Sequence, residues 1–374
     1  MNDQTTIFLT GATGILGSNI LFELLPFYVT GKLKGKIVLL IRPCRSKSPE
    51  QRIREILTNP SIPHNIRSIP ADDWLKFLVI INSELNNFSA KELPCGTTNY
   101  TVIHAAASVD LGQNAITGKE IETNNYQGTI HLLNELSHVC KKFIFVSTAY
   151  SSGHRKGEIG NDFLITDNYL FRNPYERYKH ETEKYIKEFC QNHNIEWKIF
   201  RPSIICGRLI EPPFYAISRF IVFYLFARYA SVMRNKFNGS TLRLHVPEKA
   251  VINIVPVDFV AKTVIASMES PVQQLNIVHP ENVSCRELFK NGFKLIKFNN
   301  FSFVEEVPQD ITPMEKTLYT TIGQQLGPYI DTPEHHFDTK ELFDLMKGTY
   351  LPEVEEHFCG LLEFAANHRF SALY

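Results

Sequence analysis

Hydrophobic residues in the first half of the chain gather in short runs that alternate with segments of helical spacing. Unbroken apolar runs such as Ile37–Ile41 predict buried strands, whereas the spacing of apolar residues over 175–190 predicts a helix. By these criteria strands are expected at 7–9, 37–41, 77–81, 101–104, 143–146 and 197–200, and helices at 18–25, 51–57, 129–139 and 175–190. Such alternation is typical of a parallel sheet that helices cover on both faces. We therefore predict a doubly wound α/β fold.

The rhythm changes after Gly207, where Pro212-Pro213 interrupts the pattern. The elements expected beyond this point are an aromatic helix over 214–233, a strand at 253–257, a helix capped by Asp258, a strand at 275–279 and a mostly helical stretch over 312–374. We predict a first domain at 1–207 and a smaller, mostly helical lobe at 208–374. Segments around 253–262 and 275–279 are expected to return to the first domain.

Charge and apolar content restrict the possible partners. Lys and Arg together number 39, as do Asp and Glu, so the balance gives no general attraction to nucleic acid or to an anionic membrane. The most apolar stretch, Phe220–Ala227, is far shorter than the roughly 20 residues that cross a bilayer. Arg219 and Arg228 bracket it, which leaves a peripheral membrane contact open.

Cysteine and histidine give no pattern for a metal site. The seven cysteines are scattered without a CxxC pair, and His335-His336 with Asp338 has neither helical nor hairpin ligand spacing. We expect a solvated loop at these histidines, no metal, and reduced thiols in a cytoplasmic protein. The polar segment Met1–Thr6 has no signal-peptide pattern.

A glycine-rich loop follows the first strand and opens the first helix. Small residues there let the backbone approach a pyrophosphate, and the helix N-terminus offers free N–H groups and the positive end of a dipole. The loop residues expected to hold a dinucleotide are Gly11, Thr13, Gly14, Ile15, Leu16 and Gly17. This context between a strand and a helix predicts a Rossmann-type domain.

The end of the second strand indicates which dinucleotide binds. An acidic residue at this position would accept the ribose 2′-OH of NAD, whereas an arginine suits the 2′-phosphate of NADP. The strand ends in Arg42, and Arg52 follows on the next expected helix. Because a guanidinium forks onto phosphate, we expect NADPH as the cofactor. The alternative is a pair of solvated surface arginines.

Tyr175 and Lys179 stand four residues apart on a predicted helix, so their side chains lie on one face. A neighbouring ammonium favours the phenolate and brings the tyrosine pKa toward working pH, as proton transfer to a carbonyl oxygen requires. Ser147 and Thr148 end the preceding strand, and a hydroxyl there would stabilise a developing oxyanion. The alternative for the helix is an amphipathic, ion-paired surface, and for the hydroxyls a structural turn.

The order of these motifs resembles the extended branch of the short-chain dehydrogenase/reductase superfamily over about 200 residues. The match includes the GxxGxxG loop and the helix pattern of Asn173, Tyr175, Glu176, Lys179 and Glu183, with Tyr178 replacing the usual serine. The resemblance implies Thr148, Tyr175 and Lys179 as catalytic residues, with Lys179 also binding the cofactor. Further cofactor-site residues that it implies are Leu85, Ala105, Ala106, Asn125, Pro202, Ser203 and Ile204. Relatives have Gly-Asp-Leu where this chain has Ser83-Glu84-Leu85, a departure at the adenine contact.

Within that superfamily, the chain looks like the fatty acyl reductase and thioester reductase branch, the "male sterility" domain. The similarity lies in Val146–Tyr150 with Gly157, in 255–260, and in the tail 327–339. It implies reduction of an acyl thioester, on coenzyme A or a separate carrier protein, to an aldehyde or alcohol. Two alternatives are a reductase, dehydrogenase or epimerase acting on a sugar nucleotide, steroid or other carbonyl or alcohol, and a non-enzymatic NADP sensor. The aromatic residues over 214–230 suit a core, a lid or an apolar substrate wall.

Overall fold

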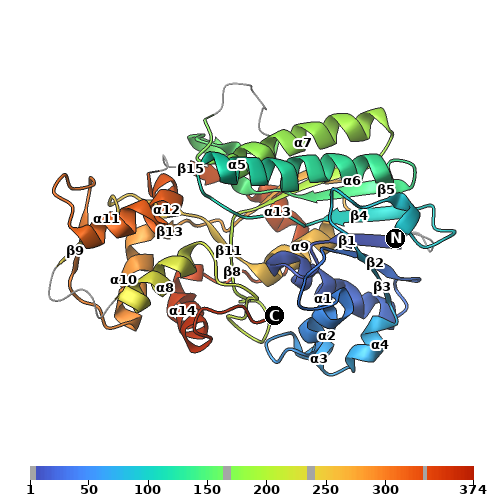
Figure 1. The fold of residues 1–374 in the computed structure, drawn as a ribbon, viewed down its shortest axis with the longest axis horizontal. Coiled ribbons are helices and arrows are strands. Elements are labelled where there is room, and N and C mark those ends of the chain that lie inside the picture. Colours follow the sequence, from blue (N-terminus) through green and yellow to red (C-terminus); the bar gives the residue numbers. More distant parts are fainter. Residues whose placement is uncertain (1–5, 163–169, 234–240, 332–334) are drawn as a thin grey trace.

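A seven-stranded parallel sheet forms the centre of the protein (Figure 1). The computed structural model describes residues 6–162, 170–233, 241–331 and 335–374. The strands in spatial order are β12 (Gln274–Ile277), β7 (Glu196–Pro202), β5 (Cys140–Val146), β4 (Tyr100–His104), β1 (Thr6–Thr10), β2 (Ile37–Ile41) and β3 (Leu78–Asn82). Every neighbouring pair is parallel. The predicted Rossmann-type fold is confirmed, with the order of the strands reversing between β1 and β4.

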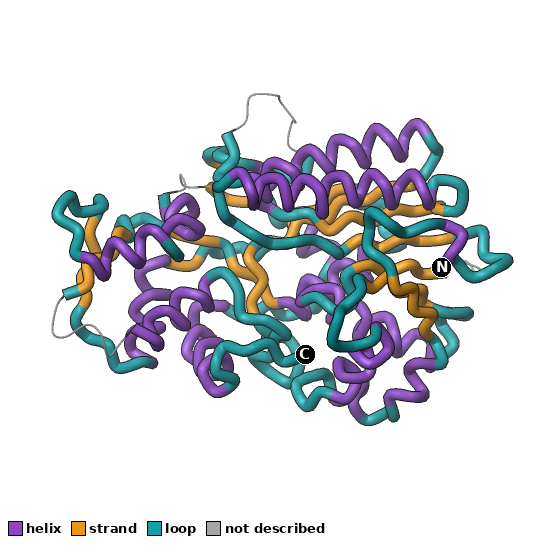
Figure 2. Tube along the Cα trace, viewed as in Figure 1, coloured by secondary structure: helices purple, strands orange, loops and turns teal. Residues whose placement is uncertain are grey.

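Helices cover both faces of this sheet (Figure 2). One face carries α1 (Ile15–Val29), α2 (Pro49–Thr58), α3 (His64–Arg67), α4 (Ala71–Leu75), α9 (Val257–Ser267) and α13 (Lys340–Leu345). The other carries α6 (Gly128–Leu136) and α7 (Pro174–Asn192), with α5 (Ala115–Ile121) and a π-helical turn at Glu122–Gln127 before α6. Short 3-10 turns lie at Ala90–Glu92, Ala149–Ser152 and Val354–His357.

Strand β2 explains why the strands are apolar throughout. Ile37, Leu39 and Ile41 belong to the core beneath α1, while Val38 and Leu40 belong to the core beneath α6 and α7. Successive side chains of a strand point to opposite faces, so a strand buried on both sides needs apolar residues at every position.

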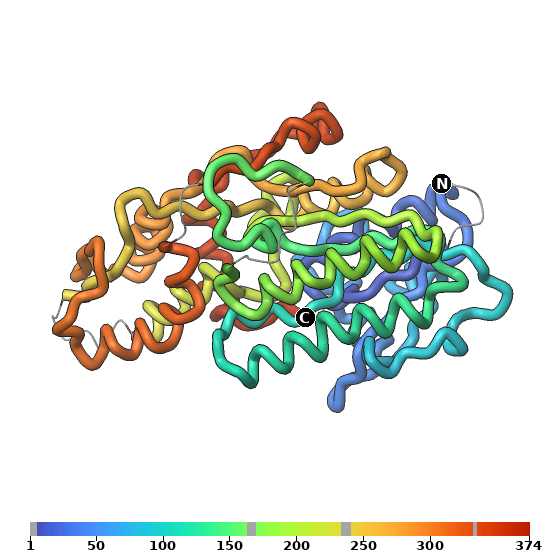
Figure 3. Tube along the Cα trace, turned by 90° about the horizontal axis from the view of Figure 1, so that it is seen from above, coloured from blue at the N-terminus to red at the C-terminus, as the bar shows by residue number. Residues whose placement is uncertain are grey.

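The lobe lies beyond one end of the sheet (Figures 1 and 3). Its helices are α8 (Phe223–Met233), α10 (Cys285–Leu295), α11 (Pro313–Thr320), α12 (Ile322–Ile330) and α14 (Phe358–Asn367). Four two-stranded sheets accompany them: β8 (Ile204–Cys206) with β11 (Ile254–Pro256), β10 (Val251–Ile252) with β13 (Val283–Ser284), β9 (Leu242–His245) with β14 (Phe301–Val304), and β6 (Gly157–Ile159) with β15 (His335–Phe337).

Two segments from late in the chain lie with the central sheet and its helices. Strand β12 forms the edge of the main sheet beside β7, and α9 packs against α1. Among the described residues, no helix is both long and apolar enough to cross a membrane. All seven cysteines carry free thiols.

The aromatic helix predicted over 214–233 is shorter than expected, because α8 begins only at Phe223. Within this segment Phe220, Tyr224 and Phe226 are buried in the aromatic core of the lobe, where α8 meets α10 and α14. Packing against those helices therefore accounts for the apolar run.

Two smaller predictions were wrong. Asp258 does not cap α9, because Pro256 occupies the N-cap; its carboxylate instead accepts hydrogen bonds from the backbone N–H groups of Leu209, Ile210 and Glu211 at 2.9–3.2 Å. His335 is buried in β15, which pairs with β6, so this part of the chain is a strand and not a solvated loop.

Candidate active site

A cleft of about 280 Å³ opens at the carboxyl ends of the central strands, where ligands bind in open α/β sheets. The sequence-predicted residues that line it are Gly14, Ile15, Leu16, Gly17, Ala105, Ser147, Thr148, Tyr175, Lys179, Pro202, Ser203 and Ile204. Its other lining residues include Val109, Leu111, Tyr150, Arg219, Ile221, Val222 and Tyr329. The cleft therefore lies between the glycine loop, the strand ends and the lobe.

The glycine loop is too tight for side chains. A Cβ added to Gly17 would lie 2.0 Å from the carbonyl oxygen of Gly11, and one on Gly11 would lie 2.7 Å from the carbonyl carbon of Ala105. Gly11 also has a φ of +75°, which favours glycine. Gly14 is the N-cap of α1 and supplies no capping side chain, so the first turn of the helix keeps N–H groups for an anion.

A chain of hydrogen bonds supports the loop that follows β4. The Thr10 hydroxyl lies 2.7 Å from His104 Nδ1 and accepts the Ala106 N–H, while His104 Nε2 lies 2.9 Å from the Thr129 hydroxyl. Burial lowers the pKa of His104 to about 3, so this ring is neutral. Asn125 Oδ1 accepts the Ser108 N–H at 2.8 Å, and Asn125 Nδ2 donates to the Ser108 carbonyl at 2.9 Å. Asn125 and Ala106 thus hold the wall of the cleft without lining it.

Arg42 and Arg52 lie beside the glycine loop. The Arg52 guanidinium donates to the Arg42 carbonyl at 2.7 Å and to the Thr13 hydroxyl at 2.9 Å. These bonds fix Arg52 against the loop, although neither arginine nor Thr13 lines the cleft itself. Leu85 is partly buried beside Gly128, also outside the cleft lining.

The two hydroxyls after β5 have different surroundings. Ser147 Oγ and Ser151 Oγ both donate to the buried Glu183 carboxylate, which makes Ser147 part of a structural network. Thr148 Oγ1 makes only a long contact, 3.3 Å, with the Tyr150 N–H. Thr148 is therefore the hydroxyl that a substrate oxygen could engage.

Tyr175 and Lys179 come from the first turns of α7, which begins at Pro174 after the N-cap Asn173. Lys179 Nζ donates to the Val146 carbonyl at 2.6 Å and lies 5.9 Å from the centre of the Tyr175 ring. Burial lowers the pKa of Lys179 to about 7 and raises that of Tyr175. The sequence led us to expect that Lys179 would lower the pKa of Tyr175. In the protein without cofactor, burial raises this pKa instead, so the phenol is protonated.

A buried polar cluster positions the start of α7. Asn173 Nδ2 donates to the Tyr329 hydroxyl at 2.9 Å, and Arg172 pairs with Glu176 at 3.1 Å. The Arg172 guanidinium also lies 5.6 Å from the Tyr150 ring and 5.4 Å from the Tyr329 ring. Tyr329, on α12 of the lobe, is thereby fixed in the cleft above Tyr175's helix.

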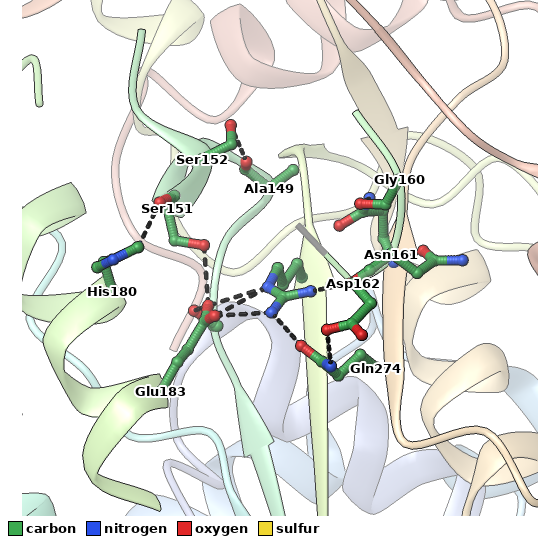
Figure 4. A network of polar contacts seen from close by, with 12 residues as sticks. Ala149, Ser151, Ser152, Gly160, Asn161, Asp162, His180, Glu183 and Gln274 are labelled. Atoms are coloured by element: carbon green, nitrogen blue, oxygen red, sulfur yellow. Dashed lines mark hydrogen bonds and ion pairs between the residues drawn. The ribbon is translucent and has the colours of Figure 1, made fainter. Parts of the chain in front are cut away.

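Glu183 forms the second buried cluster (Figure 4). Its carboxylate, fully shielded from solvent, accepts from Ser147, Ser151 and the Arg201 guanidinium, with the closest Arg201 contact at 2.8 Å. Arg201 continues to Gln274 at 2.7 Å, which ties α7 and β7 to the edge strand β12. Ser147 and Ser151 connect this cluster to the chain segment that carries Thr148.

Sequence reasoning missed the residues that approach from the lobe. Arg219, Val222 and Tyr329 are distant in sequence from the motifs, and no local pattern indicates which way they face. The available signals were the weak similarity of 327–330 to relatives and the aromatic segment 214–230, for which a substrate wall was one of the interpretations. A tertiary contact of this kind is not encoded in short-range spacing.

The residues present fit a nicotinamide dinucleotide. The glycine cradle leaves room for backbone approach to a pyrophosphate, and Ser203 Oγ, buried at the cleft, has no hydrogen-bond partner among the described residues. Such a hydroxyl suits the carboxamide of a nicotinamide ring. No cluster of three metal-binding side chains occurs in the parts of the chain that the structure describes.

Comparison with known proteins points to one family. The sequence profile described as male sterility protein matches residues 9–264. Mouse fatty acyl-CoA reductase 1 is 29% identical over 156 residues, which cover 40% of this chain and 29% of that protein. UDP-glucose 4-epimerase of Vibrio cholerae is 25% identical over 238 residues, covering 62% of this chain and 61% of the epimerase. The chain thus aligns with less than two thirds of either relative.

Solved structures share the fold over nearly the whole chain. The terminal R domain of the myxalamid PKS-NRPS pathway has a TM-score of 0.71 at 18% identity, covering 99% of this chain and 92% of that domain. UDP-glucuronic acid 4-epimerase of Bacillus cereus, in complex with NAD, has a TM-score of 0.65 at 15% identity, covering 98% and 99%. At these identities the likeness concerns the fold alone.

Proposed function

The chain belongs to the male sterility protein family, and from this premise we propose that it is an NADPH-dependent reductase of acyl thioesters. In this proposal residues 1–207 bind the cofactor and residues 208–374 shape the substrate side. The observation that carries it is the gathering of Thr148, Tyr175 and Lys179 with the glycine loop around one cleft that also has an apolar wall.

Preference for NADPH follows from the charge beside the glycine loop. Arg52 is held by Thr13 and by the Arg42 carbonyl, and neither arginine pairs with a carboxylate among the described residues. Two unneutralised guanidinium groups at the ribose side suit the charged 2′-phosphate of NADP, whereas the 2′-OH of NAD carries no charge for them to neutralise. The bound cofactor supplies a hydride to the substrate carbonyl carbon.

Tyr175 is the proton donor in this proposal. Burial keeps its phenol protonated, which is the form needed to give a proton to a carbonyl oxygen during reduction. Thr148 donates a second hydrogen bond to the same oxygen and stabilises its developing charge. The tetrahedral hemithioacetal then collapses to an aldehyde and a free thiol. Burial lowers the pKa of Lys179 to about 7, so this residue adds positive charge beside Tyr175 below about that pH.

An acyl chain suits the wall formed by the lobe. Ile221 and Val222 of the lobe line the cleft, together with Val109 and Leu111 from the loop after β4. A second, mainly apolar cavity of about 350 Å³ lies on the other side of α12, where Leu326, Pro328 and Ile330 line it. Tyr329 of the same helix lines the first cleft, so α12 separates the two spaces. Apolar walls of this kind bind alkyl groups and not the polar face of a sugar.

The relatives support this substrate class. The mouse relative is named a fatty acyl-CoA reductase, and the R domain comes from a PKS-NRPS pathway. The epimerase of Vibrio cholerae favours a second candidate, a reaction on a sugar nucleotide.

A substrate screen tests the proposal. We expect NADPH oxidation with acyl-CoAs of medium to long chain, with release of free coenzyme A. The same assay is run with UDP-glucose, simple ketones and aldehydes. Conversion of UDP-sugars without any turnover of thioesters would replace the proposal with the second candidate.

A further inference from the structure

Arg219, Ile221 and Val222 of the lobe line the cleft, and the residues on both sides of Arg219 are held in place. Phe220, the residue after Arg219, is buried in the aromatic core of the lobe. The centre of its ring lies 5.4 Å from that of Tyr224 and 6.2 Å from that of Phe364. Ser218, on the other side, accepts the Leu373 N–H through its carbonyl at 2.9 Å. The exposed Arg219 side chain therefore projects from a fixed point of the lobe.

The same contacts attach this point to the cofactor side of the cleft. The Tyr374 hydroxyl lies 3.1 Å from Ser18 Oγ, in the first turn of α1 directly after Gly17. Asn59, just after α2, donates its side-chain amide to the Leu373 carbonyl at 3.0 Å. Residues 373 and 374 thus hold the segment around 218 against the glycine-loop helix, and Arg219 lines the cleft together with Gly14–Gly17.

Positive charge accumulates around this opening without a matching acid. Burial lowers the pKa of Arg52, the neighbouring Cys44 raises it, and the charges of Arg219 and Arg42 lower it. None of these three guanidinium groups pairs with a carboxylate in the described ranges. Like charges held close together raise the free energy of the empty site, and an anion between them relieves the repulsion.

We propose that Arg219 is a phosphate ligand of the cofactor, reaching from the lobe to the pyrophosphate that lies on the glycine loop. This assignment rests on the proposed function, which places a dinucleotide in the cleft. The pyrophosphate is the group concerned because Arg219 shares the cleft with Gly14–Gly17, whereas Arg42 and Arg52 lie outside its lining. The lobe then contributes directly to cofactor binding, so a domain of residues 1–207 alone would lack one ligand.

Binding of dinucleotides without any substrate tests the assignment. We expect Arg219→Gln to raise the Kd of NADPH and of NADH by the same factor, about 10-fold or more, as loss of a hydrogen bond to a charged group does. Arg219→Lys keeps the charge and should recover part of the affinity. Arg228→Gln is the matched control, because Arg228 is exposed on α8 and lines a separate hollow. Titration calorimetry on the full chain measures all four proteins.

Other outcomes would overturn the assignment in distinguishable ways. A loss for NADPH alone would place Arg219 at the 2′-phosphate. Unchanged cofactor affinity with a raised KM for acyl-CoA would place it at the phosphates of the substrate. Unchanged affinity and unchanged KM would leave Arg219 without a ligand. A wild-type protein that binds neither dinucleotide would refute the proposed function together with this assignment.

Discussion

The buried ion pair between Glu183 and Arg201 gives the sharpest prediction on stability. Glu183 and Arg201 are both fully shielded from solvent, and the carboxylate accepts three hydrogen bonds from Arg201 besides those from Ser147 and Ser151. Glu183→Gln removes the negative charge and leaves the Arg201 guanidinium buried without its counter-ion. Breaking one partner of such a pair costs about 3–5 kcal/mol.

Urea unfolding of the wild type and Glu183→Gln measures this difference in the free energy of unfolding. The control is Glu188→Gln, an exposed position on the same helix, which should change stability by less than about 0.5 kcal/mol. The double variant Glu183→Leu with Arg201→Met removes both charges and should recover much of the loss.

A loss below about 1 kcal/mol in Glu183→Gln would refute the reasoning, because that is the size of an exposed ion pair. The folded fraction of the variant should also lose activity, since Ser147 and Ser151 flank Thr148 and lose their charged acceptor. Full activity per folded molecule would show that Thr148 does not depend on this cluster.

Three further predictions concern the cofactor, pH and the acyl chain. Arg52→Ala should raise the Kd of NADPH at least about 10-fold and leave the Kd of NADH unchanged, as measured by calorimetry. The control is Arg54→Ala, because the Arg54 side chain pairs with Asp72. An equal rise in Kd for both cofactors would exclude the 2′-phosphate role of Arg52. Burial lowers the pKa of Lys179 to about 7, whereas the unfolded chain keeps the ordinary lysine pKa near 10. Between about pH 7 and 10 the unfolded state therefore binds more protons than the folded state, and the free energy of unfolding should rise with pH across this window. Lys179→Met should flatten that rise in urea titrations, and an unchanged slope would argue against a depressed pKa. Leu326→Trp should fill the second cavity and move the kcat/KM optimum to shorter acyl-CoAs; an unchanged chain-length profile would exclude that cavity as the acyl site.

The sheet could be predicted from sequence because its signals are local. Strand β2 is apolar at every position because both of its faces are covered. The glycine loop needs glycine because a Cβ on Gly17 would clash with the Gly11 carbonyl. The spacing of Tyr175 and Lys179 likewise follows from one turn of a helix.

The lobe side of the cleft could not be predicted, because it depends on contacts between distant segments. The Tyr329 hydroxyl is held by a hydrogen bond from Asn173, 156 positions earlier in the chain. The position of Arg219 depends on Leu373, which bonds to the neighbouring Ser218, and on Tyr374, which bonds to Ser18. The start of α8 was predicted too early for the same reason: Phe220, before the helix begins at Phe223, packs in the lobe core without being helical. Similarly, Asp258 looked like a cap by its position, yet its carboxylate is taken by the backbone at 209–211.

Transfer of deuterium from labelled cofactor to product tests the central claim most directly. The protein is incubated with an acyl-CoA and NADPH that carries deuterium at the transferable position of its nicotinamide, and the product is analysed by mass spectrometry. We expect one deuterium at the former thioester carbon of an aldehyde product, or two where reduction continues to the alcohol, for each coenzyme A released. The rate should be about 10²–10⁴-fold lower in Tyr175→Phe with NADPH affinity retained. An aldehyde or alcohol without deuterium, or an undiminished rate in Tyr175→Phe, would contradict hydride transfer to a thioester with Tyr175 as the proton donor.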